Sequence, residues 1–310
     1  MGTHIEAAFA LAGNGARKTT ARRLADAAAR NCFALADRRA GDIDMLINVG
    51  IYREDSMGEP ALAALIQEDI GANLGHPPNG GPGTFSFDLL NGSCGVITAV
   101  QIESGLLQSG VIRLGAVVSS DVQPELENPG ARFLRPAGGA MLLRWDDRLA
   151  GFTDFSTETF PEYEDLFTSG LVWQERHGVR APRQSIGRHR MAVAMKPGYQ
   201  ARLVDCAEDA TRRFMRRVGL GVEDIDLLVA SPSRAGFVDP LRTRLGIPGD
   251  RVAYTPEDLD GTYTTGPIAA LQAAIKSGRL GEANNALLLA AGAGITVALA
   301  LYRQTPPDDG

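Results

Sequence analysis

The sequence has few cysteines and few histidines, residue types that commonly hold metals and carry redox chemistry. Its 310 residues contain three cysteines, which stand far apart in the chain, and four histidines. No two cysteines form a Cys-x-x-Cys pair, so we expect neither a metal site nor a redox motif. An odd number of scattered cysteines suits a reducing compartment, which favours a cytoplasmic location. The three are Cys32, Cys94 and Cys206.

A strong net charge and long apolar runs are also lacking. The formal net charge is −6, without the basic excess typical of nucleic-acid binding, so we expect no nucleic-acid partner. The first residues do not follow the basic-then-apolar order of a signal peptide. The most apolar stretch, residues 286–302, is short for a membrane span and is interrupted by Gly292 and Gly294. Two buried strands joined by a glycine turn explain it better, so we expect no membrane span.

What the sequence does contain is an alternation of short β-rich runs with longer amphipathic segments. This alternation is typical of βαβ units and of a mostly parallel sheet. The order of elements repeats in two halves, residues 1–150 and 151–310, which share little sequence. Residues 154–199 are rich in Arg, Pro and Gly, which predicts a long irregular insertion, often a lid or binding segment. Strands are expected at residues 5–11, 45–51, 85–90, 111–118, 140–143, 227–230, 251–254, 287–290 and 295–301, and helices at 19–38, 60–74, 95–107, 201–218, 238–245 and 268–277.

Cys94 is the most informative single residue. It follows an expected strand and a tight turn of small residues, and it directly precedes the helix that begins at Gly95. A thiol at a helix N-terminus lies at the positive end of the helix dipole, which favours the reactive thiolate. A strand–turn–helix also presents its side chain at the end of a sheet, where α/β proteins bind ligands. On residue type alone, the alternative of a buried cysteine that only packs is favoured, and the strand–turn–helix placement makes the two interpretations about equal.

Several motifs together resemble the ketoacyl synthase III branch of the thiolase superfamily. Residues 85–110 look like the nucleophile segment of that branch, with Cys94 at the nucleophile position. Residues 135–143 resemble its glycine-rich strand, and residues 291–296, Ala-Gly-Ala-Gly-Ile-Thr, resemble its terminal glycine motif. The resemblance covers almost the whole chain. It implies an α/β thiolase fold, with duplicated βαβαβ halves in a five-layer αβαβα arrangement, and an oxyanion-binding role for Gly292 and Gly294.

Two positions depart from the pattern of that branch. Ser233 stands where the family has its catalytic histidine, and Thr262 stands where the family has its asparagine. A serine hydroxyl does not act as a general base near neutral pH. The four histidines do not lie at a matching position; they are His4, His76, His177 and His189. The resemblance therefore implies an incomplete catalytic set, in which Cys94 is either a nucleophile or a vestige of one.

Glu59 directly precedes Pro60 at the start of an expected helix. A carboxylate there interacts well with the helix dipole, which is a sufficient structural reason for it. The arrangement also resembles the head-to-head acyl-CoA condensing enzymes of long-chain olefin synthesis (OleA-like). In that group the glutamate before the proline reaches across the dimer interface and serves as a base in the partner's site. The resemblance implies the same role, in trans, for Glu59.

Taken together, these features resemble the degenerate subunit of the heterodimeric condensing enzymes of lipstatin-type β-lactone biosynthesis. The resemblance implies an accessory subunit of an acyl-CoA Claisen-condensing acyltransferase, inactive alone, whose paralogous partner carries the complete Cys-His-Asn set. The expected substrate is an acyl-CoA or acyl-carrier thioester, with no permanently bound cofactor. Two alternatives remain open, a self-sufficient acyltransferase or thioesterase that depends on Cys94, and a non-catalytic acyl-binding scaffold.

Overall fold

The computed structural model describes residues 2–13, 19–53, 60–73, 75, 83–122, 125–126, 134–147, 151–176, 186–231 and 235–304. The strands are β1 Gly2–Ala12, β2 Met45–Asn48, β3 Phe85–Asp88, β4 Leu114–Asp121, β5 Glu125–Leu126, β6 Ala137–Asp146, β7 Gly151–Thr159, β8 Phe167–Arg176, β9 Ile186–Met195, β10 Leu227–Ser231, β11 Asn285–Gly292 and β12 Thr296–Arg303. The helices are α1 Ala21–Leu35, α2 Leu62–Ile70, α3 Gly95–Gln108, α4 Tyr199–Val218, α5 Ala235–Leu245, α6 Gly266–Lys276 and α7 Arg279–Glu282.

Within the described residues, nine strands form one continuous ladder in the order β10-β11-β12-β7-β1-β6-β4-β2-β3. The sheet is mixed, whereas the sequence predicted a mostly parallel one. β2 pairs in parallel with β3 and β4, and β10 with β11, but β6 and β12 run antiparallel to their neighbours. For β11 and β12 the antiparallel pairing follows from the tight turn that joins them, which only antiparallel strands permit.

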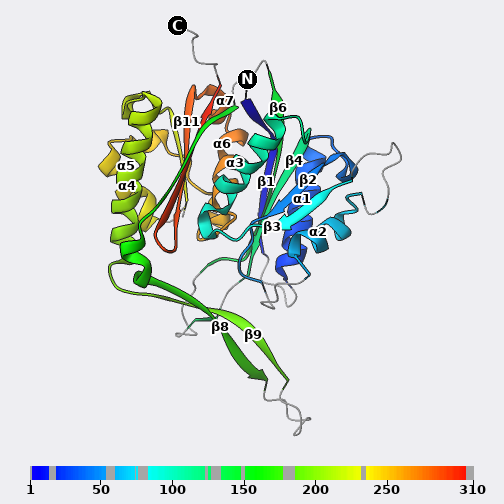
Figure 1. The fold of residues 1–310 in the computed structure, drawn as a ribbon. Coiled ribbons are helices and arrows are strands. Elements are labelled where there is room, and N and C mark those ends of the chain that lie inside the picture. The colour runs from blue at the N-terminus through cyan, green and yellow to red at the C-terminus, as the bar shows by residue number, and fades with distance from the viewer. Residues whose placement is uncertain are drawn as a thin grey trace.

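The elements are stacked in five layers (Figure 1). Helices α3 and α6 lie between the two halves of the strand ladder, α1 and α2 cover the outer face of one half, and α4 and α5 cover the outer face of the other. Three apolar clusters fill the spaces between these layers: one surrounds the central helices, and the others lie beneath the outer helices. This is the five-layer αβαβα arrangement that the sequence predicted.

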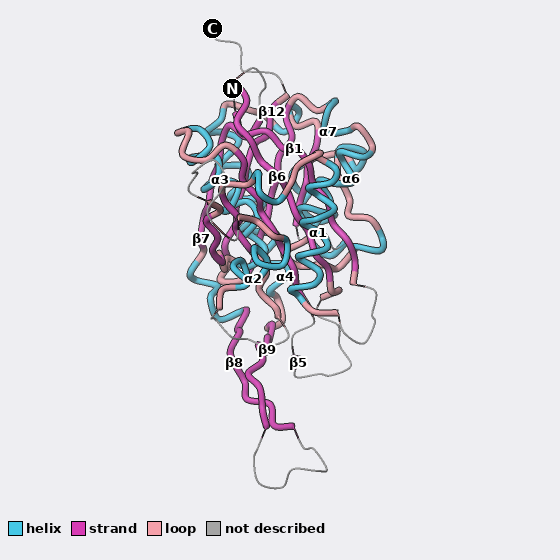
Figure 2. The backbone as a smooth tube through the Cα atoms, turned by 90° about the vertical axis from the view of Figure 1, so that its right-hand side faces the viewer, coloured by secondary structure: helices cyan, strands magenta, loops and turns pink. Residues whose placement is uncertain are grey.

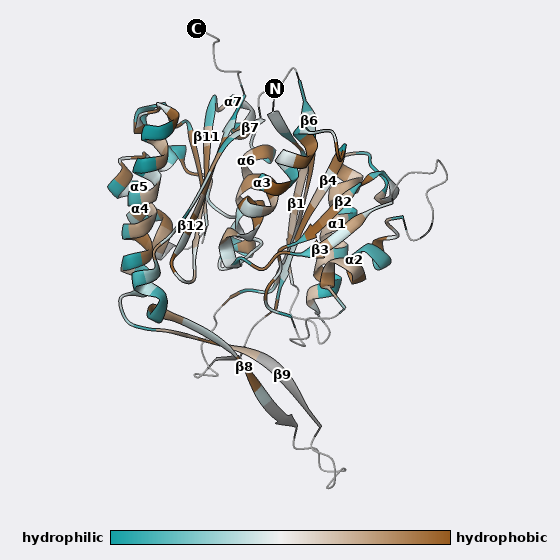
Figure 3. Ribbon diagram, viewed as in Figure 1, coloured by the Kyte–Doolittle hydropathy of each residue, from teal (hydrophilic) through white to brown (hydrophobic). Residues whose placement is uncertain are grey.

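The hydropathy of each helix follows its layer (Figure 3). The outer helix α4 has a polar face toward solvent, while Leu203, Ala207 and Phe214 are buried against the sheet. The central helix α3 carries mostly apolar residues, because it is covered by strands on both sides. No helix within the described residues is long and apolar enough to cross a membrane.

The prediction of an irregular insertion at residues 154–199 is wrong. β7 enters the main ladder between β12 and β1, and β8 pairs with β9 along its whole length, from Phe167 opposite Met195 to Arg176 opposite Ile186. This hairpin extends away from the layered body (Figure 2). Leu171 and Val172 are exposed although they point to opposite faces, so the ribbon lacks the apolar–polar alternation of a half-buried strand. The strand predicted at residues 251–254 is also reduced, to a single bridge between Val252 and Leu228.

Candidate functional site

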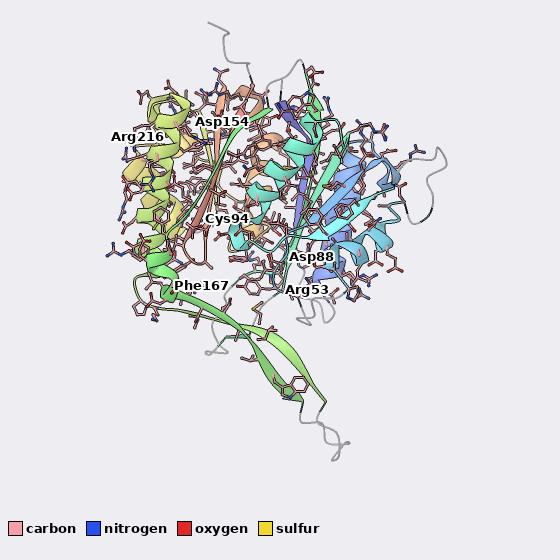
Figure 4. The ribbon with its side chains drawn as sticks, viewed as in Figure 1. Arg53, Asp88, Cys94, Asp154, Phe167 and Arg216 are labelled. Carbon is pink, nitrogen blue, oxygen red and sulfur yellow. The ribbon has the colours of Figure 1, made fainter. Side chains whose placement is uncertain are left out.

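Cys94 lies at a strand–turn–helix junction, as the sequence predicted. β3 leads through a short 3-10 turn, Gly92–Cys94, directly into α3, and Cys94 occupies the capping position of that helix. Gly92 makes the turn with a φ of 52°, a left-handed conformation that favours glycine. Figure 4 shows Cys94 in the interior, near one end of α3. The junction therefore positions the thiol between the two halves of the molecule.

The surroundings of Cys94 oppose the thiolate that its helix position led us to expect. The residue is 1% exposed. Its Sγ lies 3.5 Å from the carbonyl oxygen of Ala290 and 3.4 Å from that of Thr296, so the thiol donates toward two acceptors. Burial raises the pKa of Cys94 to about 12. Loss of hydration outweighs the helix dipole here, because an anion next to two carbonyl oxygens has little to stabilise it.

The terminal glycine motif lies directly against the Cys94 turn. The Ser93 hydroxyl donates to the carbonyl of Ala291 at 2.5 Å. A Cβ added at Gly292 would lie 2.5 Å from the same hydroxyl oxygen, so this close approach requires glycine. Gly294 makes the turn between β11 and β12 with a φ of 97°. The backbone N–H of Cys94 donates within its own turn, to Asn91 at 3.0 Å. The oxyanion-binding role of Gly292 and Gly294 stays a prediction.

A pocket of about 480 Å³, partly open to solvent, lies beside this junction and includes Thr262 in its wall. Thr262 is 3% exposed, and its hydroxyl has no hydrogen-bond partner among the described residues. Cys94 is not one of the described residues that line the pocket. The wall is mainly apolar and is formed by Leu134, Phe167, Met195, Tyr199, Gln200, Leu203, Thr262, Tyr263, Ala291 and Gly292.

Asp121, at the end of β4, joins the loops around the pocket, and the sequence analysis missed it. One carboxylate oxygen accepts from the backbone N–H groups of Ile51 and Tyr52, at 3.0 and 2.9 Å. The other accepts from the backbone N–H and the hydroxyl of Thr264. Burial raises the pKa of Asp121, and these hydrogen bonds oppose that shift. An acid at the end of the apolar run of β4 is the sequence signal that points to such a buried, bonded carboxylate.

Asp88, at the end of β3, holds both flanks of the segment that contains Glu59. Its carboxylate pairs with Arg53 at 2.9 Å and accepts from the backbone N–H groups of Leu62 and Ala63 at 2.9 and 2.8 Å. Arg53 and Asp88 lie side by side in Figure 4. Asp88 therefore supplies the charge at the N-terminus of α2 that the sequence analysis assigned to Glu59 as a structural alternative.

Two of the predicted site residues, Glu59 and Ser233, lie outside the described residues, as do His76 and His177. His4 lies far from this site in the fold, where its Nδ1 is 2.9 Å from the Tyr302 hydroxyl. Among the described residues, no cluster of His, Cys, Asp and Glu side chains could hold a metal ion. The structure thus brings Cys94, Gly292 and Thr262 into one region through Ser93 and the pocket wall.

Comparisons with known proteins agree with this architecture. A family model described as 3-oxoacyl-[acyl-carrier-protein (ACP)] synthase III C terminal matches residues 215–304. The β-ketoacyl-[acyl-carrier-protein] synthase III of Acidiphilium cryptum is 29% identical over 288 residues, which cover 89% of this chain and 82% of that protein. The crystal structure of synthase III from Thermus thermophilus matches with a TM-score of 0.78 at 22% identity, covering 97% of this chain and 99% of that one.

A structure of OleA from Xanthomonas campestris with bound lauric acid and lauroyl-CoA also matches, with a TM-score of 0.75 at 16% identity, covering 98% of this chain and 99% of that one. At these identities the structural matches establish the fold. The sequence matches add a similarity to synthase III proteins, which in the A. cryptum protein extends over most of the chain. The chain therefore has the thiolase-like α/β fold that its motifs predicted, and its sequence is similar to those of synthase III proteins.

Proposed function

We propose that the chain is an accessory subunit of an acyl-CoA Claisen-condensing enzyme and donates Glu59 to the site of a catalytically complete paralogue. The observation that carries this proposal is the state of Cys94. Its thiol is buried against two carbonyl oxygens, with a raised pKa, and Thr262 stands where a synthase III has asparagine. A nucleophile needs a base or a lowered pKa to form a thioester. The described part of this chain offers Cys94 neither.

The condensation assigns separate tasks to the two subunits. One acyl group must be held on an activated cysteine, with its carbonyl oxygen in an oxyanion hole, while a carbanion forms on the second acyl thioester. The partner's Cys-His-Asn set performs the first task. Glu59 performs the second, as the base that removes a proton from that thioester. The substrates are acyl-CoA or acyl-carrier thioesters, and no permanently bound cofactor takes part.

The open edge of the sheet supports the donation of Glu59 to another subunit. β3 is the last strand of the ladder, and Asp88 at its end holds the residues on both sides of the Glu59 segment. Phe85, the first residue of this strand, and Leu90, two residues after its end, are each 63% exposed. An open edge with exposed apolar side chains is a ready surface for strand pairing with another chain. A partner bound there would lie beside Asp88, which holds Arg53 and Leu62 on the two sides of the Glu59 segment.

A non-catalytic acyl-binding scaffold is the second candidate. The apolar pocket beside Thr262 favours it, because a pocket without an activated nucleophile binds a thioester without reacting. The two candidates make different predictions for Glu59. An accessory subunit needs Glu59 for the condensation itself, whereas a scaffold contributes only to binding and to the assembly of the complex.

The test is co-expression with a condensing paralogue from the same genome that carries the complete Cys-His-Asn set. Glu59→Gln keeps the shape of the side chain and removes its basicity. It should lower the condensation rate of the purified complex by roughly a hundredfold or more, which is the usual contribution of a general base. Glu68→Gln is the matched control, because its carboxylate lies on α2 with 66% of the side chain exposed. If Glu59→Gln and Glu68→Gln complexes condense at the same rate, Glu59 is not the donated base.

A further inference from the structure

Tyr263 follows Thr262 in the chain and reaches the turn that carries Cys94. A Cβ added at Gly92 would lie 3.0 Å from the Tyr263 hydroxyl oxygen, so the phenol rests against this turn. Tyr263 also lines the pocket. One side chain therefore lies between the turn of Cys94 and the space where a ligand would bind.

The position of Tyr263 is fixed by its neighbours. Its ring lies 5.3 Å from that of Tyr52, centroid to centroid, with a tilt of 44° between the ring planes. The buried Asp121 carboxylate accepts hydrogen bonds from the backbone of both Tyr52 and Thr264. The backbone beside each ring is thus tied to one carboxylate, so the tyrosine pair has little freedom to move away from Gly92.

Cys94 is near this phenol but outside the pocket. The Tyr263 hydroxyl lies against Gly92, which belongs to the same short turn as Cys94, Gly92–Cys94. Cys94 is almost fully buried. It is not among the described residues that line the pocket.

We propose that Tyr263 is a specificity-determining residue whose phenol separates the pocket from the Cys94 thiol, so that a thioester bound in the pocket stays intact. The inference rests on the proposed function, in which the reacting cysteine belongs to the partner subunit. It adds the reason why this chain does not divert the substrate onto its own cysteine. The chain keeps a cysteine at the nucleophile position but closes the path to it.

The described pocket wall suits an intact thioester. Leu134, Met195 and Leu203 offer an apolar surface for an acyl chain. The Thr262 hydroxyl, buried and without a partner in the described structure, is free to donate to a carbonyl oxygen. The described lining residues include no carboxylate, lysine, arginine or histidine. The wall can therefore hold a neutral carbonyl compound, but it offers no group that would cleave the compound.

The test is the rate at which N-ethylmaleimide alkylates Cys94 in the folded chain, followed by mass spectrometry of the peptides. Tyr263→Ala opens the wall, and Tyr263→Phe keeps the ring while removing the hydroxyl. We expect Tyr263→Ala to speed the labelling of Cys94 by at least about tenfold, and Tyr263→Phe to change it by less than about twofold, because access limits the reaction of a buried thiol. Tyr254→Ala, at an exposed tyrosine, is the matched control and should change nothing.

Cys32 and Cys206 are internal references, because both are buried elsewhere in the fold. If all three cysteines label faster together in Tyr263→Ala, the substitution has loosened the whole chain, and the specific wall is disproved. The wild-type chain gives a check that needs no variant: Cys94 should label at least about a hundredfold more slowly in the folded chain than in urea. Fast labelling of folded wild-type Cys94 overturns the proposal. Neither result depends on condensation, so the accessory role is tested separately.

Discussion

Two carboxylates in the first half of the molecule and two hydroxyls in the second half differ in whether they have hydrogen-bond partners. In the first half, Asp88 is the last residue of β3 and Asp121 the last residue of β4, and both carboxylates are bonded to several donors. In the second half, Ser231 at the end of β10 and Thr262 near the start of α6 are buried with hydroxyls that have no partner among the described residues. Buried polar groups are normally satisfied. The comparison teaches that Asp121 holds the loops around the pocket firmly, whereas Thr262, which lines the pocket, has a buried hydroxyl that is available to a ligand.

Asp121→Ala should produce the largest change in stability. It leaves the backbone N–H groups of Ile51, Tyr52 and Thr264 buried without an acceptor. Because each buried, unsatisfied donor costs about 1 to 3 kcal/mol, we expect the free energy of unfolding to fall by roughly 4 kcal/mol. Urea denaturation, followed by circular dichroism, measures this fall in the free energy of unfolding. Asp121→Asn keeps one acceptor oxygen and should lose less, and equal losses for the two variants would show that the carboxylate does not clamp these loops.

Thr262→Val and Thr264→Val should give the smallest effects, with opposite signs. Thr264 donates its hydroxyl to Asp121, so its replacement removes a bond to a charged group and should destabilise the chain by about 2 kcal/mol. The Thr262 hydroxyl is buried without a partner in the described structure, so its replacement by a similar apolar shape should stabilise the chain by about 1 kcal/mol. The two substitutions are chemically identical, and the two threonines stand only two positions apart in the chain. If both variants lose stability equally, the contrast between the two halves does not hold at this loop.

The sequence predicted correctly those features of the fold that depend on residues close together in the chain. The strand, turn and helix around Cys94 were predictable because small residues in the turn and an apolar helix are visible in a short window. The five layers followed from the family resemblance, whereas the alternation of elements alone predicted a mostly parallel sheet. The hairpin of β8 and β9 was not predictable by alternation, because a ribbon exposed on both faces has no buried side to mark.

The environment of Cys94 was not predictable from the sequence around it. The acceptors of its thiol, Ala290 and Thr296, are about two hundred positions away in the chain, and so is the Ser93 partner Ala291. The helix dipole could be inferred from neighbours in sequence, but the burial that overrides it comes from the other half of the molecule. For the same reason, the hydrogen bond between Asp121 and Thr264 was not predictable from the residues next to either one in the sequence.

The most direct measurement of the central claim is the location of the acyl group in the assembled enzyme. The complex of this chain with its complete paralogue is incubated with an acyl-CoA, and the intact mass of each subunit is measured before the second substrate is added. The account predicts an acyl adduct on the partner's cysteine and none on this chain, with or without Cys94→Ala. A stable adduct on this chain that disappears in Cys94→Ala would contradict it and would make the chain a self-sufficient acyltransferase.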